Sequence, residues 1–485
     1  MKNKLLHKLF KSALLGCTFV GIIVSYSSCR KIRTTTVENL VAGNLKERIS
    51  TEEITSTEKL VISGQLNGTD ISLIREMTRE GKLSQVDISE TSIVSGGKPY
   101  YIGKGYASYR DTTKHYTHDN EIGEYMFSCC YNMKSIKLPK TIRKIQRYAF
   151  EICHITQITI PDSCEEVCQY AFTKCPELEH VKISAKVHYW GPTNCEECPS
   201  ILSFEVDNNN QYYSSENGVL YSKDGSKIVK YPIGKKEKNF KLKTSLNTIG
   251  YSAFRDAQIK KIEIPETVTV IEDGAFTGCK ELTDINIPSQ ISKIHDFTFA
   301  GCEKLESIML PQGLEEIGDL AFGDCKSLKT IHIGEKIKKI SSIAFSRGLL
   351  SLREYSVSPQ NTFFTASDKM LMTKDKKTIL AVPSLTDSIF YIQDGIENIN
   401  GWAFSNTQNI KEIVFPKTLK EINSMAFSEN KSLKVIQCPI EDATQLKIKG
   451  KLQLNKDCTW YIPSGKKSLY EQCDWWNKSW HIIEF

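Results

Sequence analysis

Cysteine is the residue whose number and spacing most directly suggest chemistry in this chain, which contains 16 of them. Cys195 and Cys198 form a Cys-x-x-Cys pair, and Cys164 and Cys168 lie a short distance before them. Such spacing is typical of zinc sites and of redox-active dithiols. Whether these thiols do chemistry or only pack depends on the elements that hold them.

A phrase that ends in Ala-Phe, or in a close variant, recurs at intervals of 22 or 23 residues. Ile-x-Ile within the phrase predicts a short strand with both isoleucines on one face. Because one such unit cannot bury its own apolar side chains, we expect successive units to stack. The sequence therefore predicts a leucine-rich repeat solenoid of short parallel β-strands, turns, and 3-10 or short helical segments. The repeated phenylalanines are Phe127, Phe150, Phe172, Phe254, Phe276, Phe299, Phe322, Phe345, Phe404 and Phe427.

The repeat register accounts for most of the cysteines. Counting from Phe172 places Cys195 at the Phe position and Cys198 three residues later, so this motif is a degenerate Phe-x-x-Cys. We expect packing as small apolar residues, with disulfides between neighbouring units and metal or redox chemistry as the alternatives. The other cysteines three residues after a repeat Phe are Cys130, Cys153, Cys175, Cys279, Cys302 and Cys325. Cys164 and Cys438 take inward positions, and those outside the scheme, which could pair, are Cys129, Cys168, Cys458 and Cys473.

Two gaps of 59 residues, Cys195 to Phe254 and Phe345 to Phe404, interrupt the repeat and contain matching residues. In the first gap, apolar runs flank Asp224-Gly225, a pair typical of β-hairpin turns. We therefore expect two β-hairpin inserts, near residues 204–240 and 354–392, within a repeat region that covers residues 121–440.

Different units are expected at the two ends, because a solenoid exposes an apolar face there. Residues 38–120 predict an N-terminal cap with a tyrosine-rich loop and a helix that Thr69 or Asp70 caps at its N-terminus. Residues 441–485 predict a C-terminal cap rich in tryptophan. We expect these tryptophans to pack, with a stacking platform for sugar rings as the alternative.

The first 28 residues predict an export signal, because a basic start precedes an apolar run too short to span a membrane. Residues 25–29 resemble the lipobox of bacterial lipoproteins, which implies that Cys29 carries a lipid and that residues 29–37 form a linker. Tyr26 departs from the usual Leu, and the alternative is an ordinary cleaved signal with a free Cys29. The basic residues 30–33 leave cell-surface and periplasmic locations open for this outer-membrane lipoprotein.

The overall charge of the chain does not indicate that it binds nucleic acid. The chain has 63 basic and 57 acidic residues, and four of the lysines lie in the leader. The remaining excess is too small for the clustered phosphate contacts of a nucleic-acid-binding protein.

The phrase Ile-Pro-x-x-Val/Ile-x-x-Ile-x-x-x-Ala-Phe-x-x-Cys-x-x-Leu resembles the BspA-like class of bacterial leucine-rich repeat proteins, over roughly residues 120–440. The resemblance implies a secreted or surface-attached protein. Several members are adhesins, and their ligands are varied or unknown. The resemblance implies no catalytic residue and no cofactor.

Ligand-binding candidates lie on the exposed positions of the Ile-x-Ile strands and in the loop between residues 93 and 121. A merely solvated face, and a loop that folds back over the first repeats, are the alternatives. His115-x-x-His118-Asp119 could bind a metal, but the sequence shows no further ligand. The strand candidates are Lys137, Thr159, Lys182, Glu263, Asn286, Met309 and His332, and the loop candidates are Tyr100, Tyr101, Tyr106 and Tyr109.

These features predict an exported, lipid-anchored binding protein of adhesin type, with an unidentified protein or glycan as its ligand and only its lipid in the membrane. A structural or accessory lipoprotein of the periplasm, without a diffusible ligand, is the alternative. We expect no enzyme, because GxSxG, HExxH and P-loop patterns are absent from the sequence.

Overall fold

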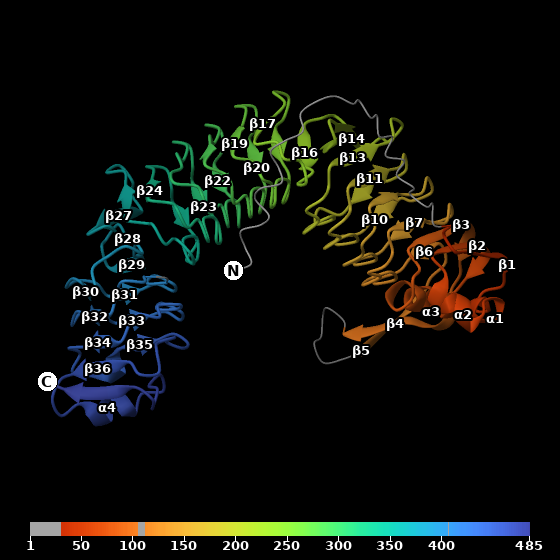
Figure 1. The fold of residues 1–485 in the computed structure, drawn as a ribbon. Coiled ribbons are helices and arrows are strands. Elements are labelled where there is room, and N and C mark those ends of the chain that lie inside the picture. Colours follow the sequence, from red (N-terminus) through yellow and green to blue (C-terminus); the bar gives the residue numbers. More distant parts are fainter. Residues whose placement is uncertain (1–30, 105–111, 406) are drawn as a thin grey trace, which may run out of the picture.

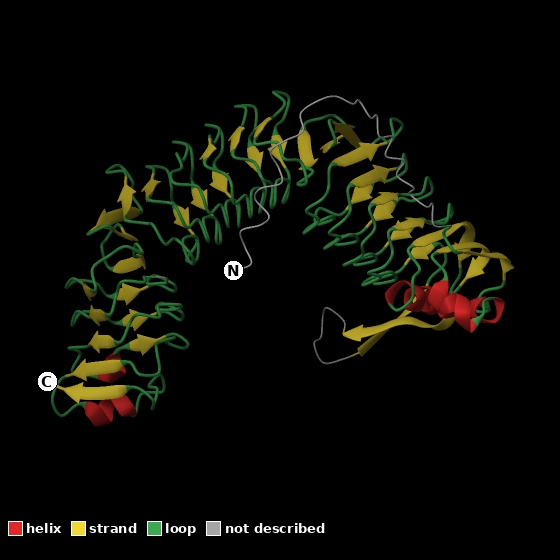
Figure 2. Ribbon diagram, in the orientation of Figure 1, coloured by secondary structure: helices red, strands yellow, loops and turns green. Residues whose placement is uncertain are grey.

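The computed structural model describes residues 31–104, 112–405 and 407–485, and Figure 1 shows them as a curved stack that forms an arch. Each turn of the stack, here called a rung, contributes short strands that pair in parallel with those of the neighbouring rungs. The predicted repeat solenoid is therefore confirmed. Among the residues described, helices lie only at the two ends of the arch (Figure 2).

The Ile-x-Ile phrases form the strands of a first ladder along the stack. In β11, His180 and Lys182 are directed outward while Val181 and Ile183 are buried, as alternation with period two requires. The strands of this ladder in the repeat region and C-terminal cap are β7 (Ser135–Lys137), β9 (Gln157–Thr159), β11 (His180–Ile183), β13 (Ser203–Val206), β17 (Asn239–Lys241), β19 (Lys261–Glu263), β21 (Asp284–Ile285), β24 (Thr330–Ile333), β26 (Glu354–Val357), β30 (Ile389–Tyr391), β32 (Glu412–Val414), β34 (Val435–Gln437), β36 (Thr459–Ile462) and β37 (His481–Glu484).

A second ladder, which the sequence did not predict, is formed by two-residue strands just before each repeat Phe. Ile145 of this ladder pairs with both Ile122 and Val167, and all three side chains are buried. Within the described residues, the one 3-10 segment is η1 (Ala443–Gln445). The repeat strands of this ladder are β6 (Glu121–Ile122), β8 (Lys144–Ile145), β10 (Glu166–Val167), β12 (Tyr189–Trp190), β18 (Thr248–Ile249), β20 (Val270–Ile271), β22 (Lys293–Ile294), β23 (Glu316–Ile317), β25 (Lys339–Ile340), β31 (Asn398–Ile399), β33 (Glu421–Ile422) and β35 (Lys447–Ile448).

The repeat phenylalanines stack on one another along the third edge of the rungs. The rings of Phe127 and Phe150 are 5.4 Å apart and those of Phe150 and Phe172 are 5.3 Å apart. Their backbones also connect the rungs, since the Phe127 N–H donates to the Ala149 carbonyl at 2.7 Å. Each rung is thus held by two ladders and by this Phe turn.

Both predicted hairpin inserts are present, each with one more strand than expected. In the first insert, β14 (Tyr213–Glu216), β15 (Val219–Ser222) and β16 (Lys227–Lys230) form an antiparallel meander. The last strand then pairs in parallel with β18 and so returns the chain to the second ladder. The second insert repeats this arrangement with β27 (Phe364–Ser367), β28 (Met370–Thr373) and β29 (Thr378–Ala381).

The N-terminal end consists of β1 (Thr34–Leu40), α1 (Leu45–Arg48), α2 (Thr51–Ser56), β2 (Lys59–Leu66), α3 (Gly68–Arg79) and β3 (Gln85–Ile93). Strand β1 begins inside the range predicted as a linker, because Thr35 and Val37 are buried where β1 pairs with β2. The start predicted for α3 was late. Asn67 is the N-cap, accepting from the Thr69 N–H, and Asp70 accepts from the Asn67 N–H to complete a capping box.

The C-terminal end consists of β36, α4 (Lys467–Glu471) and β37. Trp460 is fully buried, and its ring lies 5.7 Å from that of Trp480. Tyr470 closes the apolar face of the last rung and donates to the Ile440 carbonyl at 2.6 Å. Packing, the interpretation favoured for these tryptophans, is therefore what the structure shows.

Both ladders are interrupted near the middle of the arch. Residues 307–310 repeat the Ile-x-Ile phrase but form no strand, and β20 does not pair with β22. The Phe turns remain connected there, since the Phe299 N–H donates to the Ala321 carbonyl at 2.9 Å. Strand pairing is thus incomplete at this point of the stack, while the Phe turns stay hydrogen-bonded to one another.

Candidate binding surfaces

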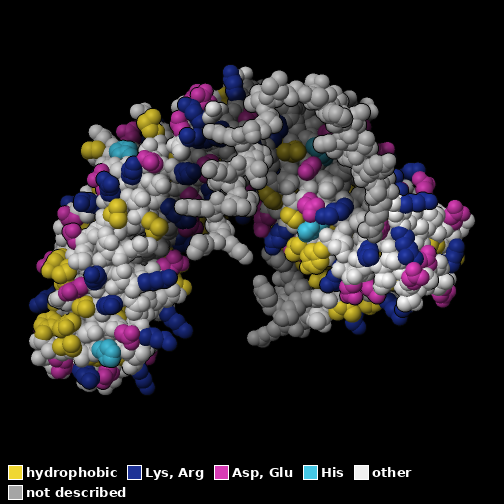
Figure 3. All heavy atoms as spheres, viewed as in Figure 1, with side chains coloured by type: hydrophobic (Ala, Val, Ile, Leu, Met, Phe, Trp, Pro, Cys, Tyr) yellow, Lys and Arg dark blue, Asp and Glu magenta, His cyan; other side chains and the backbone are white. Residues whose placement is uncertain are grey.

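Exposed side chains of the first ladder line up in columns along the stack. Thr159 pairs directly with Lys182, and Lys182 with Glu205. Since strands are about 4.8 Å apart, a ligand that lies along the stack meets one such side chain per rung. Figure 3 shows basic and acidic side chains interspersed over much of the visible face.

Two grooves lie beside these columns, at the ends of the strands. The first continues from Ser135 to Asp207, through two adjoining hollows of about 600 and 200 Å³ that share Thr159, Ile160 and Asp162. The second, of about 500 Å³, lies beside β17, β19 and β21. Aliphatic side chains line both grooves. The structure brings five candidates to them: Lys137, Thr159, Lys182, Glu263 and Asn286.

Several strand candidates are already paired with the preceding or following rung. Lys137 lies 2.9 Å from the Asp87 carboxylate, which raises the pKa of the lysine, and Lys182 lies 3.4 Å from Glu205. The Asn286 amide accepts from the Ile264 N–H and donates to its carbonyl, each at 2.8 Å. The Asn286 side chain therefore takes the place of backbone pairing with Ile264. Its amide is already hydrogen-bonded and is not free for a ligand.

The remaining strand candidates lie outside the grooves. His332 Nδ1 is 2.9 Å from the Ser356 hydroxyl. Met309 is 87% exposed and lies in the segment where the first ladder is interrupted. These two are therefore separated from the five candidates that the grooves bring together.

The tyrosine-rich loop is a hairpin of β4 (Gly96–Lys104) and β5 (Thr112–Thr117), and its base folds back on the first rungs. Tyr100 is buried and donates to the Glu124 carbonyl at 2.9 Å. Tyr101 lies with its ring 5.2 Å from that of Tyr125. Tyr106 and Tyr109 lie outside the described residues. The described tyrosines of β4 thus attach the hairpin to the stack.

His115 packs within this base rather than beside His118 in a ligand set. Its ring is 5.6 Å from Tyr101 and 5.4 Å from Tyr125, and its Nε2 is buried without a hydrogen-bond partner. The Asp119 carboxylate accepts from the Ser95 N–H at 2.6 Å. Among the described residues, no group of three His, Cys, Asp or Glu side chains is placed to hold a metal ion.

A stack of tyrosines on the Phe-turn edge was missed by sequence reasoning. The rings of Tyr125 and Tyr148 are 5.1 Å apart and those of Tyr148 and Tyr170 are 5.2 Å apart, nearly parallel in both cases. All three residues adopt positive φ, between 57° and 61°. Each tyrosine lies two residues before a repeat Phe. This constant spacing in the sequence could have revealed the stack. At the same position further along, Phe297 is 44% exposed.

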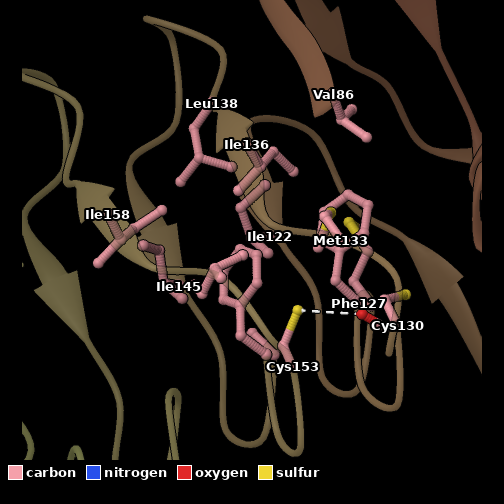
Figure 4. Packing of buried hydrophobic residues seen from close by; sticks show 14 of the residues in the cluster. Val86, Ile122, Phe127, Cys130, Met133, Ile136, Leu138, Ile145, Cys153 and Ile158 are labelled. Atoms are coloured by element: carbon pink, nitrogen blue, oxygen red, sulfur yellow. Dashed lines mark hydrogen bonds between the residues drawn. The ribbon is translucent and has the colours of Figure 1, made fainter. Parts of the chain in front are cut away.

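The cysteines of the repeat are structural, as their register predicted. The Cys175 thiol donates to the Phe150 carbonyl at 3.1 Å, and Cys198 donates to that of Phe172 at 3.0 Å. Cys153 bonds in the same way to the Cys130 carbonyl (Figure 4). All 14 cysteines within the described residues are free, including the four outside the register, and Cys29 lies outside that part of the chain.

Burial favours the protonated form of the Cys325 and Cys164 thiols. It raises the pKa of Cys325 and Cys164 to about 12, from an ordinary 9.0. Because the thiolate is the nucleophile and the metal ligand, this environment disfavours both kinds of chemistry.

Over the described residues, no helix is long and apolar enough to cross a membrane.

Comparison with known families gives one match. The model of the BspA type leucine rich repeat region matches six copies, over residues 113–217, 234–353 and 384–449, which together exceed half of the chain. The two unmatched stretches between them contain β15 and β16 of the first insert, and β26 of the first ladder with β27, β28 and β29 of the second insert. No curated protein matches the chain.

Solved structures with the same kind of fold come from several bacteria. A leucine-rich repeat protein of Eubacterium ventriosum is 18% identical, with a TM-score of 0.50 over 78% of this chain and 84% of that one. A leucine rich cell surface protein of Faecalibacterium prausnitzii is 21% identical, with a TM-score of 0.41 over 67% and 79%. The pneumococcal vaccine antigen PcpA is 16% identical, with a TM-score of 0.37 over 88% and 79%. These likenesses concern the fold alone.

Proposed function

Because the chain belongs to the BspA-type leucine-rich repeat family, we propose that it is a non-catalytic binding protein of adhesin type that engages a protein or glycan along its first ladder. The observation that supports this most is the groove between Ser135 and Asp207. It crosses several rungs, has an aliphatic floor, and is edged by Lys137, Thr159 and Lys182. An extended ligand placed there would bury apolar surface and meet polar groups at regular intervals.

Anchoring through a lipid on Cys29 is the second part of the proposal, and it rests on the lipobox-like residues 25–29. Strand β1 begins at Thr34, so only a few residues would separate the lipid from the folded stack. The N-terminal end of the arch would then lie close to the outer membrane. Adhesion requires display at the cell surface, and protease treatment of intact cells distinguishes that location from the periplasm.

A structural or accessory role in the periplasm is the second candidate, and the pairing of surface charges favours it. Lys326 lies 2.9 Å from Glu303, and Lys304 lies 2.7 Å from Glu281, each pair 23 residues apart and therefore on adjacent rungs. Charges neutralised within the stack offer less to a ligand. Protection from added protease, together with no captured ligand, would favour this role.

Substitution within the groove tests the binding proposal. The folded chain, residues 31–485, is screened against protein extracts and glycan arrays, with Thr159→Trp as the blocking variant. Thr330→Trp is the matched control, because Thr330 is an exposed threonine on β24 that lines neither groove. We expect a ligand that the parent and Thr330→Trp retain and Thr159→Trp loses. No ligand across broad panels, or equal loss in both variants, would contradict the proposal.

A further inference from the structure

The overall charge of the chain is near neutral, but acidic and basic residues are distributed unevenly along the arch. Residues 255–330, at its middle, contain 14 acidic and 8 basic residues. Residues 331–456, in the C-terminal arm, contain 12 acidic and 18 basic residues. The arm therefore carries a positive excess that the sum over the chain does not show.

The excess is concentrated on one face of the arm, over the second ladder. Figure 3 shows basic side chains along the edge of the arm where Figure 1, in the same view, labels β31, β33 and β35. Five segments lead into or overlap the strands β25, β29, β31, β33 and β35. Together they contain eleven lysines and five acidic residues, and every one of these lysines is exposed. These segments are residues 335–339, 374–377, 394–397, 417–421 and 447–451.

Part of this charge is neutralised within the face and part is not. Glu397 lies 2.9 Å from Lys377 and 3.0 Å from Lys420, and Glu421 lies 2.7 Å from Lys449. By contrast, Lys417, Lys447 and Lys451 form no ion pair with any described residue. The face thus retains uncompensated positive charge, most of all on the last two segments, 417–421 and 447–451.

The arrangement fits a surface better than a single polymer strand. The lysines extend in two directions, along the stack on four of the five segments and, within each of those four, across several residues. All eleven are lysines, which act as flexible point charges, and no arginine offers the bidentate geometry that recognises individual phosphates. Aromatic side chains that would stack on nucleotide bases are also absent from these five segments.

We infer that this lysine face docks the C-terminal arm on a membrane surface rich in anionic lipid headgroups. Each lysine held near such a surface strengthens binding by about fivefold. The attraction is electrostatic and requires no lipid on the protein itself, so it is independent of both Cys29 and the groove. Screening by salt would weaken it strongly.

Sedimentation with lipid vesicles tests the inference directly. Residues 31–485, which contain every described strand and helix, are mixed with vesicles of phosphatidylcholine alone or with one third phosphatidylglycerol. The test variant is Lys417→Gln/Lys447→Gln/Lys451→Gln. The control is Lys411→Gln/Lys431→Gln/Lys434→Gln, which removes the same charge from exposed lysines beside the first ladder of the same arm.

We expect binding only to the anionic vesicles, its loss at 0.5 M salt, and a decrease of at least tenfold in the test variant with little change in the control. Absence of binding by the parent, or equal decreases in the two variants, would overturn the inference. Binding to duplex DNA without binding to vesicles would overturn it as well, because the lysines would then bind a soluble polyanion and not a membrane surface.

Discussion

Asn210 and Asn361, 151 residues apart, make the same four hydrogen bonds in the two inserts. The Asn210 amide donates to the carbonyls of Ser184 and Val187, and its oxygen accepts from the N–H groups of Tyr212 and Tyr213. Asn361 does the same with the corresponding residues of the second insert. Both side chains are fully buried, so in each insert one amide adds to the strand pairing that joins the insert to the stack.

Asn210→Ala should therefore lower the free energy of unfolding by about 3 kcal/mol, because four backbone groups lose their partner, two of them in buried hydrogen bonds. Asn361→Ala should have a similar effect. Urea titration followed by circular dichroism measures the change. Asn209→Ala is the matched control, since Asn209 is exposed and should change stability by less than about 0.5 kcal/mol. Equal effects at 209 and 210 would contradict the assignment.

Phe299 and Phe297 lie in one turn and allow a second comparison. Phe299 is fully buried between Phe276 and Phe322, each 5.7 Å away, whereas Phe297 is 44% exposed. Phe299→Ala should lower the free energy of unfolding by about 4 kcal/mol, and Phe297→Ala by less than about 1 kcal/mol. Thermal and urea unfolding of the two variants would check this. A similar loss at both positions would rule out the Phe stack as the main contact between these rungs.

Much of the fold could be predicted because the repeat imposes its own register. Ile-x-Ile identified the first ladder, the distance from Phe172 explained Cys195, and Asp224-Gly225 indicated the first insert. The second ladder could not be found in this way. Its strands are two residues long, so alternation has no room to show, and only the pairing of adjacent rungs reveals them.

The candidate site was less predictable, because its properties depend on residues one rung away. Nothing in the sequence near Asn286 shows that its amide bonds to the backbone of Ile264. The Tyr148 stack was hidden because the same turn position holds Ser252 and Leu320 elsewhere, residues that share the positive φ of the tyrosines but are not aromatic. The missing strand at Met309 could not be predicted either, because the residues around it repeat the Ile-x-Ile phrase.

The buried thiols predict a specific dependence of stability on pH. Burial raises the pKa of Cys325 to about 12 from an ordinary value of 9.0. Its contribution is therefore fully present below pH 9 and is lost as the pH rises towards 12, because the unfolded chain loses the proton first. Urea midpoints between pH 8 and 11 should decrease less steeply for Cys325→Ala than for the parent. Parallel curves would contradict the pKa assignment.

The pKa of His115 predicts that the stability of the base of the β4–β5 hairpin depends on pH in the opposite direction. Burial lowers the pKa of His115 below 6.5, an effect that nearby Arg75 reinforces and Glu124, 3.8 Å from Nδ1, opposes. The packing is thus stable above pH 6.5 and weakens as the pH falls through the lowered pKa, because the unfolded state binds the proton more readily.

Hydrogen exchange of residues 96–117, corrected for the intrinsic rate, measures this effect. Protection should decrease between pH 6.5 and 5 in the parent and in His118→Gln, which alters an exposed histidine. His115→Phe should abolish the change. If His118→Gln abolished it instead, the change would not originate at the buried ring.

Photo-crosslinking on living cells tests most directly whether the first ladder is a binding surface. A benzophenone side chain is placed at position 159, within the groove, or at position 330, on the same ladder outside it. We predict a discrete covalent adduct with one partner from position 159 and none from position 330. No adduct at either position, or the same adducts at both, would contradict binding in the groove.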